Sequence, residues 1–240
     1  MADTLALSSG TFQVVSSTGS TTNQTLAVTT QTTASGTTEV VTTTNPGGTS
    51  GSLSGVNYTV SAASINDPTN ITINSDTNQA TTNSTYTLGN ASDTLVIASS
   101  KPLTSSSGSQ FVATNSSFNL GDGDNSLTFS SAVRGITVTS GTGNDLVKVL
   151  GDVQDSKFTL GAGGDTLIFG GDVKSGTVVD LGADAVKDTI QIADGSKITG
   201  LSILNATSQD TLIIGSANYT YNETTKQWTN IADPKDKRTL

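Results

Sequence analysis

Several residue types that carry common protein chemistry are missing from this chain of 240 residues. It has no cysteine and no histidine, which excludes disulfides, thiolate metal sites and the common forms of serine-triad, cysteine-protease and zinc chemistry. Only 11 residues are basic against 20 acidic ones, so the net charge is −9 and no basic patch is available for nucleic acid. We therefore expect no nucleic-acid partner.

Hydrophobic residues are also scarce, at 33% of the chain, with 5% aromatic, which is too little for a thick two-layer core. Residues 1–8 contain no positive segment followed by an apolar run, so we expect no cleaved leader and no membrane span. Glu39 and Glu223 are the only glutamates, and the other 18 acidic residues are aspartate. Because aspartate is typical of turns and glutamate of helices, this bias indicates a fold without helices.

A repeat with a period of 20 residues occupies the middle of the chain. Segments 121–129, 141–149 and 161–169 each pass from a glycine-rich acidic turn into a short apolar strand. A fixed period in this range indicates a solenoid, in which each coil buries its apolar side chains against its neighbours. Six copies share an Asp or Asn followed by apolar residues two and four positions later, at Asp93, Asn125, Asp145, Asp165, Asp188 and Asp210.

Each coil is predicted to contain two strands, one before and one after the acidic turn, because apolar residues alternate in both segments. Val133, Val153 and Val173 recur at the opposite edge of the coil. The residues predicted to point inward are Phe118, Leu120, Val138, Phe158, Leu160, Val179 and Leu181 before the turn, and Leu127, Phe129, Val147, Val149, Leu167, Phe169, Ile190, Ile192, Leu212 and Ile214 after it.

These patterns predict an all-β fold: a single-chain β-solenoid, or β-roll, of about 20-residue coils with an extended N-terminal arm and a C-terminal hairpin cap. The arm covers residues 1–50, which hold 16 Thr and 7 Ser and are either disordered or ordered by adding strands to a neighbouring subunit. The solenoid covers 51–216 and is most regular over 118–192. Residues 217–240 form the capping hairpin and a charged tail. A homo-oligomer, such as a trimeric rod in which three chains share the core, is the alternative to closure within one chain.

Two breaks in the pattern are predicted as loops. Residues 45–48, with the sequence Asn-Pro-Gly-Gly, mark the boundary between arm and solenoid. Residues 101–108 form a loop inserted into one coil, because the interval between the first two repeat copies is 32 residues.

The acidic turns resemble the repeat of the RTX family, Gly-Gly-x-Gly-x-Asp-x-(apolar)-x, which builds calcium-binding β-rolls in exported bacterial surface proteins and occurs in some phage virion proteins. Segments 141–147 and 161–167 match it from the second glycine to the apolar position, and 121–127 has Asn in place of Asp. The first glycine of the family repeat is replaced in all three copies, and the motif occurs once per coil instead of twice.

The resemblance implies calcium bound between stacked turns, because calcium takes six to eight oxygen ligands and the turns supply carbonyls and carboxylates. The ligands it implies are Asp122, Asp124, Asn125, Asp145 and Asp165. The alternative is that glycine only supplies positive φ and aspartate only caps its own turn, with no metal.

Three functions are consistent with the sequence. The first is a non-enzymatic structural protein of an extracellular assembly, a phage virion component such as a capsid decoration or tail protein, located in the virion. It would contact other structural subunits through the N-terminal arm and the rod ends. The second is an exported, calcium-binding RTX-like surface-layer or adhesion protein, which would reach the cell surface without a leader. The third is a solenoid enzyme that degrades polysaccharides with a carboxylate pair, Asp122 with Asp124 or Asp184 with Asp188. We expect no enzyme, because the chain offers few aromatic residues and few cations to hold a sugar substrate.

Overall fold

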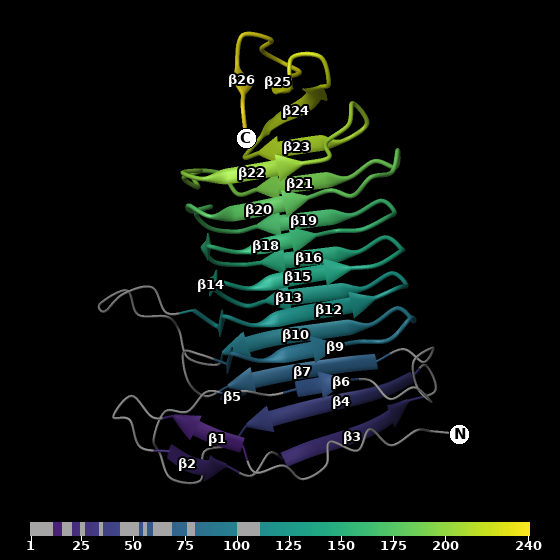
Figure 1. The fold of residues 1–240 in the computed structure, drawn as a ribbon, viewed down its shortest axis with the longest axis vertical. Coiled ribbons are helices and arrows are strands. Elements are labelled where there is room, and N and C mark those ends of the chain that lie inside the picture. The colour runs from purple at the N-terminus through teal and green to yellow at the C-terminus, as the bar shows by residue number, and fades with distance from the viewer. Residues whose placement is uncertain are drawn as a thin grey trace.

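The computed structural model describes residues 80–99 and 111–240 continuously, and before them the strands within 12–75. The fold is all-β, and its parallel coils, about 21 residues apart, form a β-solenoid of about 5 turns. Figure 1 shows the coils stacked as a rod, with the C-terminal strands at one end and β3 and β4 at the other. The predicted fold class is confirmed. The described part of the chain contains no helix that could span a membrane.

Three sheets run along the rod. The main sheet has 12 strands. They are β3 (Ala27–Thr33), β4 (Gly36–Thr43), β7 (Thr69–Ser75), β10 (Thr94–Ser99), β13 (Ser126–Phe129), β16 (Leu146–Val149), β19 (Thr166–Phe169), β21 (Thr189–Ile192), β23 (Thr211–Ile214), β24 (Ala217–Asn222), β25 (Gln227–Asn230) and β26 (Lys237–Arg238).

The second sheet has 7 strands and the corner sheet has 5. The second sheet contains β6 (Asn57–Thr59), β9 (Thr85–Thr87), β12 (Ser117–Gly121), β15 (Thr137–Ser140), β18 (Lys157–Thr159), β20 (Thr177–Asp180) and β22 (Leu201–Leu204). The corner sheet contains β5 (Leu53–Ser54), β8 (Thr81–Thr82), β11 (Ala113–Thr114), β14 (Val133–Arg134) and β17 (Val153–Gln154). A separate antiparallel pair joins β1 (Phe12–Val15) to β2 (Thr21–Gln24).

The corner sheet is the main departure from the two strands predicted for each coil. Val133 pairs with Val153 in parallel register, and Val153 forms a bridge to Val173. All three are fully buried. The valine spacing at the opposite edge of the coil therefore marks a third, two-residue strand. Such a strand is too short to show the alternation by which strands are recognised in sequence.

The core is a seam enclosed by the three sheets, and the predicted inward residues form it. All of them are buried except Ile214, which is partly buried beside the cap. Aromatic rings pack on one another along this seam. The ring centroid of Phe118 lies 5.2 Å from that of Tyr86, with the rings nearly parallel, and 5.0 Å from that of Phe129, with the rings edge to face. Because the strands are parallel and in register, each apolar side chain packs on its counterpart in the next coil.

The turn glycines explain why coils can stack so closely at the acidic edge. Gly121 and Gly161 have φ of 75° and 91°, a region that favours glycine. A Cβ on Gly121 would lie 1.7 Å from the carbonyl oxygen of Gly89, and one on Gly161 would lie 2.0 Å from that of Gly141. Backbone from the neighbouring coil therefore occupies the space that any side chain would need.

The C-terminal strands extend the main sheet in antiparallel order, and β24 and β25 form the predicted hairpin. β24 pairs with β23, β25 with β24, and β26 with β25. Tyr219 and Trp228 are buried in it, so their rings cover the last coil. The segment from Asp233 to Arg238, which lies in the predicted charged tail, is mostly exposed. It is tied to the cap at Asp236, which accepts a hydrogen bond from the Tyr219 hydroxyl.

At the N-terminal end, described strands of the predicted arm belong to the main sheet. β4 runs parallel to β7, and β3 runs antiparallel to β4. The predicted boundary at 45–48 and the predicted inserted loop at 101–108 lie outside the described residues.

Candidate functional site

The six repeat residues that precede the strands of the main sheet form one buried column. Each is at most 2% exposed, although all are polar or charged. Each stands at the end of an acidic turn, just before a strand of the main sheet. The members are Asp93, Asn125, Asp145, Asp165, Asp188 and Asp210. We call this set the aspartate column.

Hydrogen bonds connect the aspartate column from coil to coil. The backbone N–H of each of the first five members donates to a side-chain oxygen, Oδ1, of its counterpart in the following coil. These bonds are 2.9 Å from Asp93 to Asn125, 2.8 Å from Asn125 to Asp145, 2.8 Å from Asp145 to Asp165, 2.8 Å from Asp165 to Asp188 and 2.9 Å from Asp188 to Asp210. A short acceptor at this position is therefore needed in every coil, which explains why Asp and Asn recur there and longer residues do not.

The second side-chain atom of each column member has a different environment. In Asn125, Nδ2 donates to the carbonyl oxygens of its own turn, at 3.4 Å from Gly121, 3.3 Å from Asp122 and 2.9 Å from Gly123. At the last coil, Oδ2 of Asp210 accepts hydrogen bonds from Thr207.

Two members in the middle of the column lack such a partner. Oδ2 of Asp145 and Oδ2 of Asp165 are buried without a hydrogen bond. Because they hold the position that the Asn125 amide nitrogen occupies in its turn, each is an acceptor placed where Asn125 has a donor. A proton on the carboxyl or a bound cation would satisfy this arrangement.

Burial of the column also raises the pKa values of three of its carboxyl groups. Burial raises the pKa of Asp165 to about 7, and the negative charges of Asp145, Asp188 and Asp184 raise it further, against the opposing hydrogen bond from the Asp145 N–H. Burial also raises the pKa of Asp188 to about 7, together with the charges of Asp210 and Asp184. The pKa of Asp145 is raised by burial as well. Burial disfavours the charged form of each of these carboxyl groups, and the negative charges of the neighbouring aspartates disfavour it further, so the stacked carboxyls favour the neutral form.

Asp122 and Asp124, the other two predicted ligands, lie on the outer side of the same turns. Oδ1 of Asp122 accepts from the Thr142 N–H and hydroxyl, both at 2.9 Å, and these bonds lower its pKa. Oδ1 of Asp124 accepts from the Asn144 N–H at 2.7 Å. Oδ1 of Asn144 in turn accepts from the Gly164 N–H at 2.9 Å. This outer row therefore bonds in the opposite direction to the aspartate column, from the later coil back to the earlier one.

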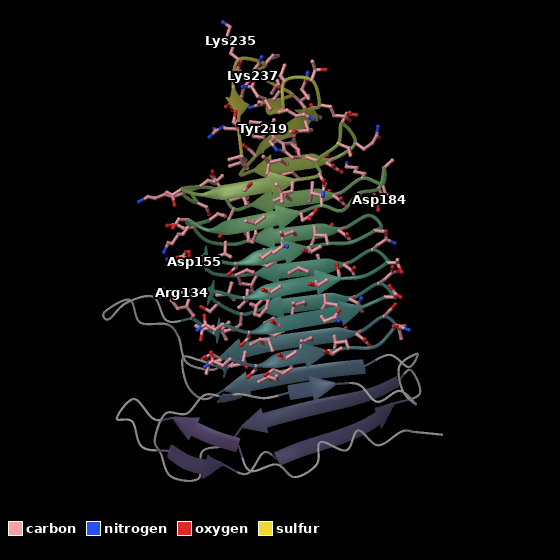
Figure 2. All side chains as sticks on the ribbon, in the orientation of Figure 1. Arg134, Asp155, Asp184, Tyr219, Lys235 and Lys237 are labelled. Carbon is pink, nitrogen blue, oxygen red and sulfur yellow. The ribbon has the colours of Figure 1, made fainter. Side chains whose placement is uncertain are left out.

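The predicted calcium ligands thus divide into two rows. Asn125, Asp145 and Asp165 lie in the buried column, and Asp122 and Asp124 lie in the outer row. In the part of the chain that the structure describes, no three carboxylates gather closely enough to form a metal-binding group. Figure 2 shows the edge of acidic turns, marked by Asp184, opposite the edge that carries Arg134 and Asp155.

The carboxylate pairs considered for glycoside hydrolysis are also bound to neighbouring backbone. Oδ2 of Asp184 accepts from the Gly163 N–H, and Oδ1 accepts from the Val186 N–H, both at 2.8 Å. Asp188 belongs to the buried column. Each of these four carboxylates accepts a hydrogen bond from the backbone of another coil through at least one of its oxygens.

A second polar column at the other corner of the coil was missed from the sequence. Oγ of Ser116 accepts from the Ser84 N–H at 3.1 Å, and Oγ of Ser156 accepts from the Ile136 N–H at 3.3 Å. The residue before each serine has positive φ: 48° at Asn83, 47° at Asn115 and 49° at Asp155. The signal available in the sequence was an Asn or Asp followed by Ser at these three places.

No family model, no curated protein and no solved structure matches this chain. The RTX resemblance therefore rests on the turn residues and on a solenoid compatible with β-roll repeats.

Proposed function

We propose that this protein is a non-enzymatic structural component of an extracellular assembly, and specifically of a phage virion, as a capsid decoration or tail protein. The observation that carries the proposal is the aspartate column. Its carboxylates, which are the most obvious candidates for chemistry in the repeats, bond to the backbone of neighbouring coils. Side chains used in this way stabilise a rod and are poorly placed to act on a substrate.

The packing supports the same function. The seam of buried apolar residues is continuous from Tyr86 to Trp228, and polar columns bond the coils at two corners. A solenoid of this kind is stabilised by contacts between successive coils and forms an extended element of defined length. Such a rod suits a role as a spacer or scaffold between other subunits.

The proposal is tested by mass spectrometry of purified virus particles whose genome encodes this chain. Peptides from the rod should occur at a stoichiometry comparable to that of other structural proteins. Particles that lack these peptides while containing the other capsid and tail proteins would contradict the virion role.

A second candidate function is an exported, calcium-binding surface-layer or adhesion protein. The unpartnered Oδ2 atoms of Asp145 and Asp165 favour it, because each lies in a glycine-rich acidic turn where a cation would supply the missing partner. The test compares the melting temperature of the purified chain in millimolar calcium and in chelator at one fixed pH. Equal melting temperatures would remove the calcium-dependent version.

A further inference from the structure

The two ends of the main sheet differ in how the last strand is built. At the C-terminal end this strand is β26, only two residues long, with exposed Lys237 and Arg238. Nε of Arg238 lies 3.1 Å from Oδ1 of Asp236, and its guanidinium lies over the ring of Tyr219. Very short, charged edge strands prevent a sheet from pairing with another chain. This end is therefore protected against extension.

At the other end, β3 is the last strand of the main sheet, and Figure 1 shows it at the end of the rod opposite the cap. It is 7 residues long, with the sequence Ala-Val-Thr-Thr-Gln-Thr-Thr, and contains no charged residue, proline or glycine. It pairs with β4 over its full length, from Ala27 with Thr42 to Thr33 with Gly36. Among the described strands, none pairs with its other side. A long, uncharged edge strand of this kind is a template for another strand.

The distribution of charge favours approach at this same end. Asp3 and Glu39 are the only charged side chains in residues 1–66, and the first basic residue is Lys101. The remainder of the chain therefore carries most of the net charge of −9. Two copies repel each other where these charges come within a Debye length of about 8 to 10 Å, and the N-terminal ends are where that repulsion is least.

We propose that the β3 edge joins two copies of this chain, which pair β3 with β3 in antiparallel register about a two-fold axis and continue the main sheet from one rod into the other. The inference rests on the proposed role in an assembly and names the partner and the joint. Identical strands related by a two-fold axis form a self-complementary contact. Full overlap centred on Thr30 pairs Val28 with Thr32 and Thr30 with itself, so no like charges are opposed.

The first test measures the mass of the full chain by size exclusion with light scattering. The wild-type chain should have twice its monomer mass of 24.3 kDa. Thr30→Lys places two ammonium groups opposite each other at the axis and should give a monomer with an unchanged circular dichroism spectrum. Thr137→Lys, a matched change at an exposed position in the middle of the rod, should remain a dimer. A wild-type chain that is monomeric at its highest soluble concentration would overturn the proposal.

The second test uses the absence of native cysteine. Directly opposed residues in antiparallel strands have Cα atoms about 4.5 to 5.5 Å apart, within the range of about 4.4 to 6.8 Å that a disulfide needs. Thr30→Cys should therefore form a covalent dimer under mild oxidation, and Thr137→Cys should not. A wild-type dimer in which Thr30→Cys fails to cross-link would show that the joint lies elsewhere. A cross-linked dimer together with particles that lack the protein would refute the virion role and leave the joint intact.

Discussion

Asp165→Asn is predicted to stabilise the rod at neutral and alkaline pH. The asparagine keeps an oxygen to accept the Asp145 N–H and supplies an Nδ2 where Oδ2 of Asp165 has no partner. It also removes a carboxyl whose pKa is raised from 3.8 to about 7. Asn125 already shows that the column accepts this side chain.

The sign and size of the effect follow from the raised pKa. Below the unfolded value of 3.8, the carboxyl is protonated in both states and costs nothing. Between this value and about 7, the unfolded chain releases the proton and the folded chain retains it, so the free energy of unfolding falls by about 1.4 kcal/mol per pH unit. The loss reaches at most about 4 kcal/mol and is constant above the folded pKa. The stabilisation by Asp165→Asn is therefore small near pH 4 and largest above pH 7.

The measurement is the melting temperature from about pH 4 to pH 8.5 in chelator, where each kcal/mol corresponds to about 2 to 4 °C for a domain of this size. Asp194→Asn is the matched control, because Asp194 is exposed in a turn outside the column. It should follow the wild-type pH dependence. If Asp165→Asn melts below the wild-type chain at pH 8, or if the two curves run parallel at every pH, the reasoning about the column is refuted.

Three further changes are predicted to destabilise the rod. Gly161→Ala should lower the free energy of unfolding, measured in urea, by about 2 to 4 kcal/mol, because the added Cβ collides with the neighbouring coil. Gly195→Ala is the control, since Gly195 has a similar φ but open space around it, and it should lower the free energy of unfolding by only about 1 kcal/mol. Asn125→Asp should lower the free energy of unfolding by about 1 to 3 kcal/mol near pH 8, because it replaces the amide that donates to three carbonyl oxygens by an acceptor. Phe158→Ala should lower the free energy of unfolding by about 3 to 5 kcal/mol, because it opens a cavity in the seam. Thr137→Ala, at an exposed position, is the control and should change it by no more than about 0.5 kcal/mol.

The solenoid and its core could be predicted because the same pattern of apolar residues recurs in coil after coil. Phe158 and Leu160 alternate before a turn, and Leu167 and Phe169 alternate after it, so period and inward face agree in each coil. The corner sheet was not predicted as a strand layer, because Val133 and Val153 each belong to a two-residue strand without alternation. The role of β3 and β4 in the main sheet was equally hidden, since threonine-rich strands carry little apolar signal.

The candidate site was predicted in part. The sequence identified Asp145 and Asp165 as repeat positions, and the structure brings them together with Asn125 in one column. Nothing in the sequence indicated that Asp122, in the outer row, accepts from the following coil, whereas the column members accept from the preceding one. This direction depends on which coil supplies the N–H. The calcium hypothesis stays a prediction.

The most direct test of the central claim, that the repeated carboxylates serve coil stacking, is the melting temperature of the double variant Asp145→Asn/Asp165→Asn at about pH 8, in chelator and in millimolar calcium. We predict that the double variant folds in both solutions, with a circular dichroism spectrum like that of the wild-type chain. It should melt above the wild-type chain in chelator and show no response to calcium. A double variant that fails to fold, beside a wild-type chain that folds only when calcium is added, would contradict the account.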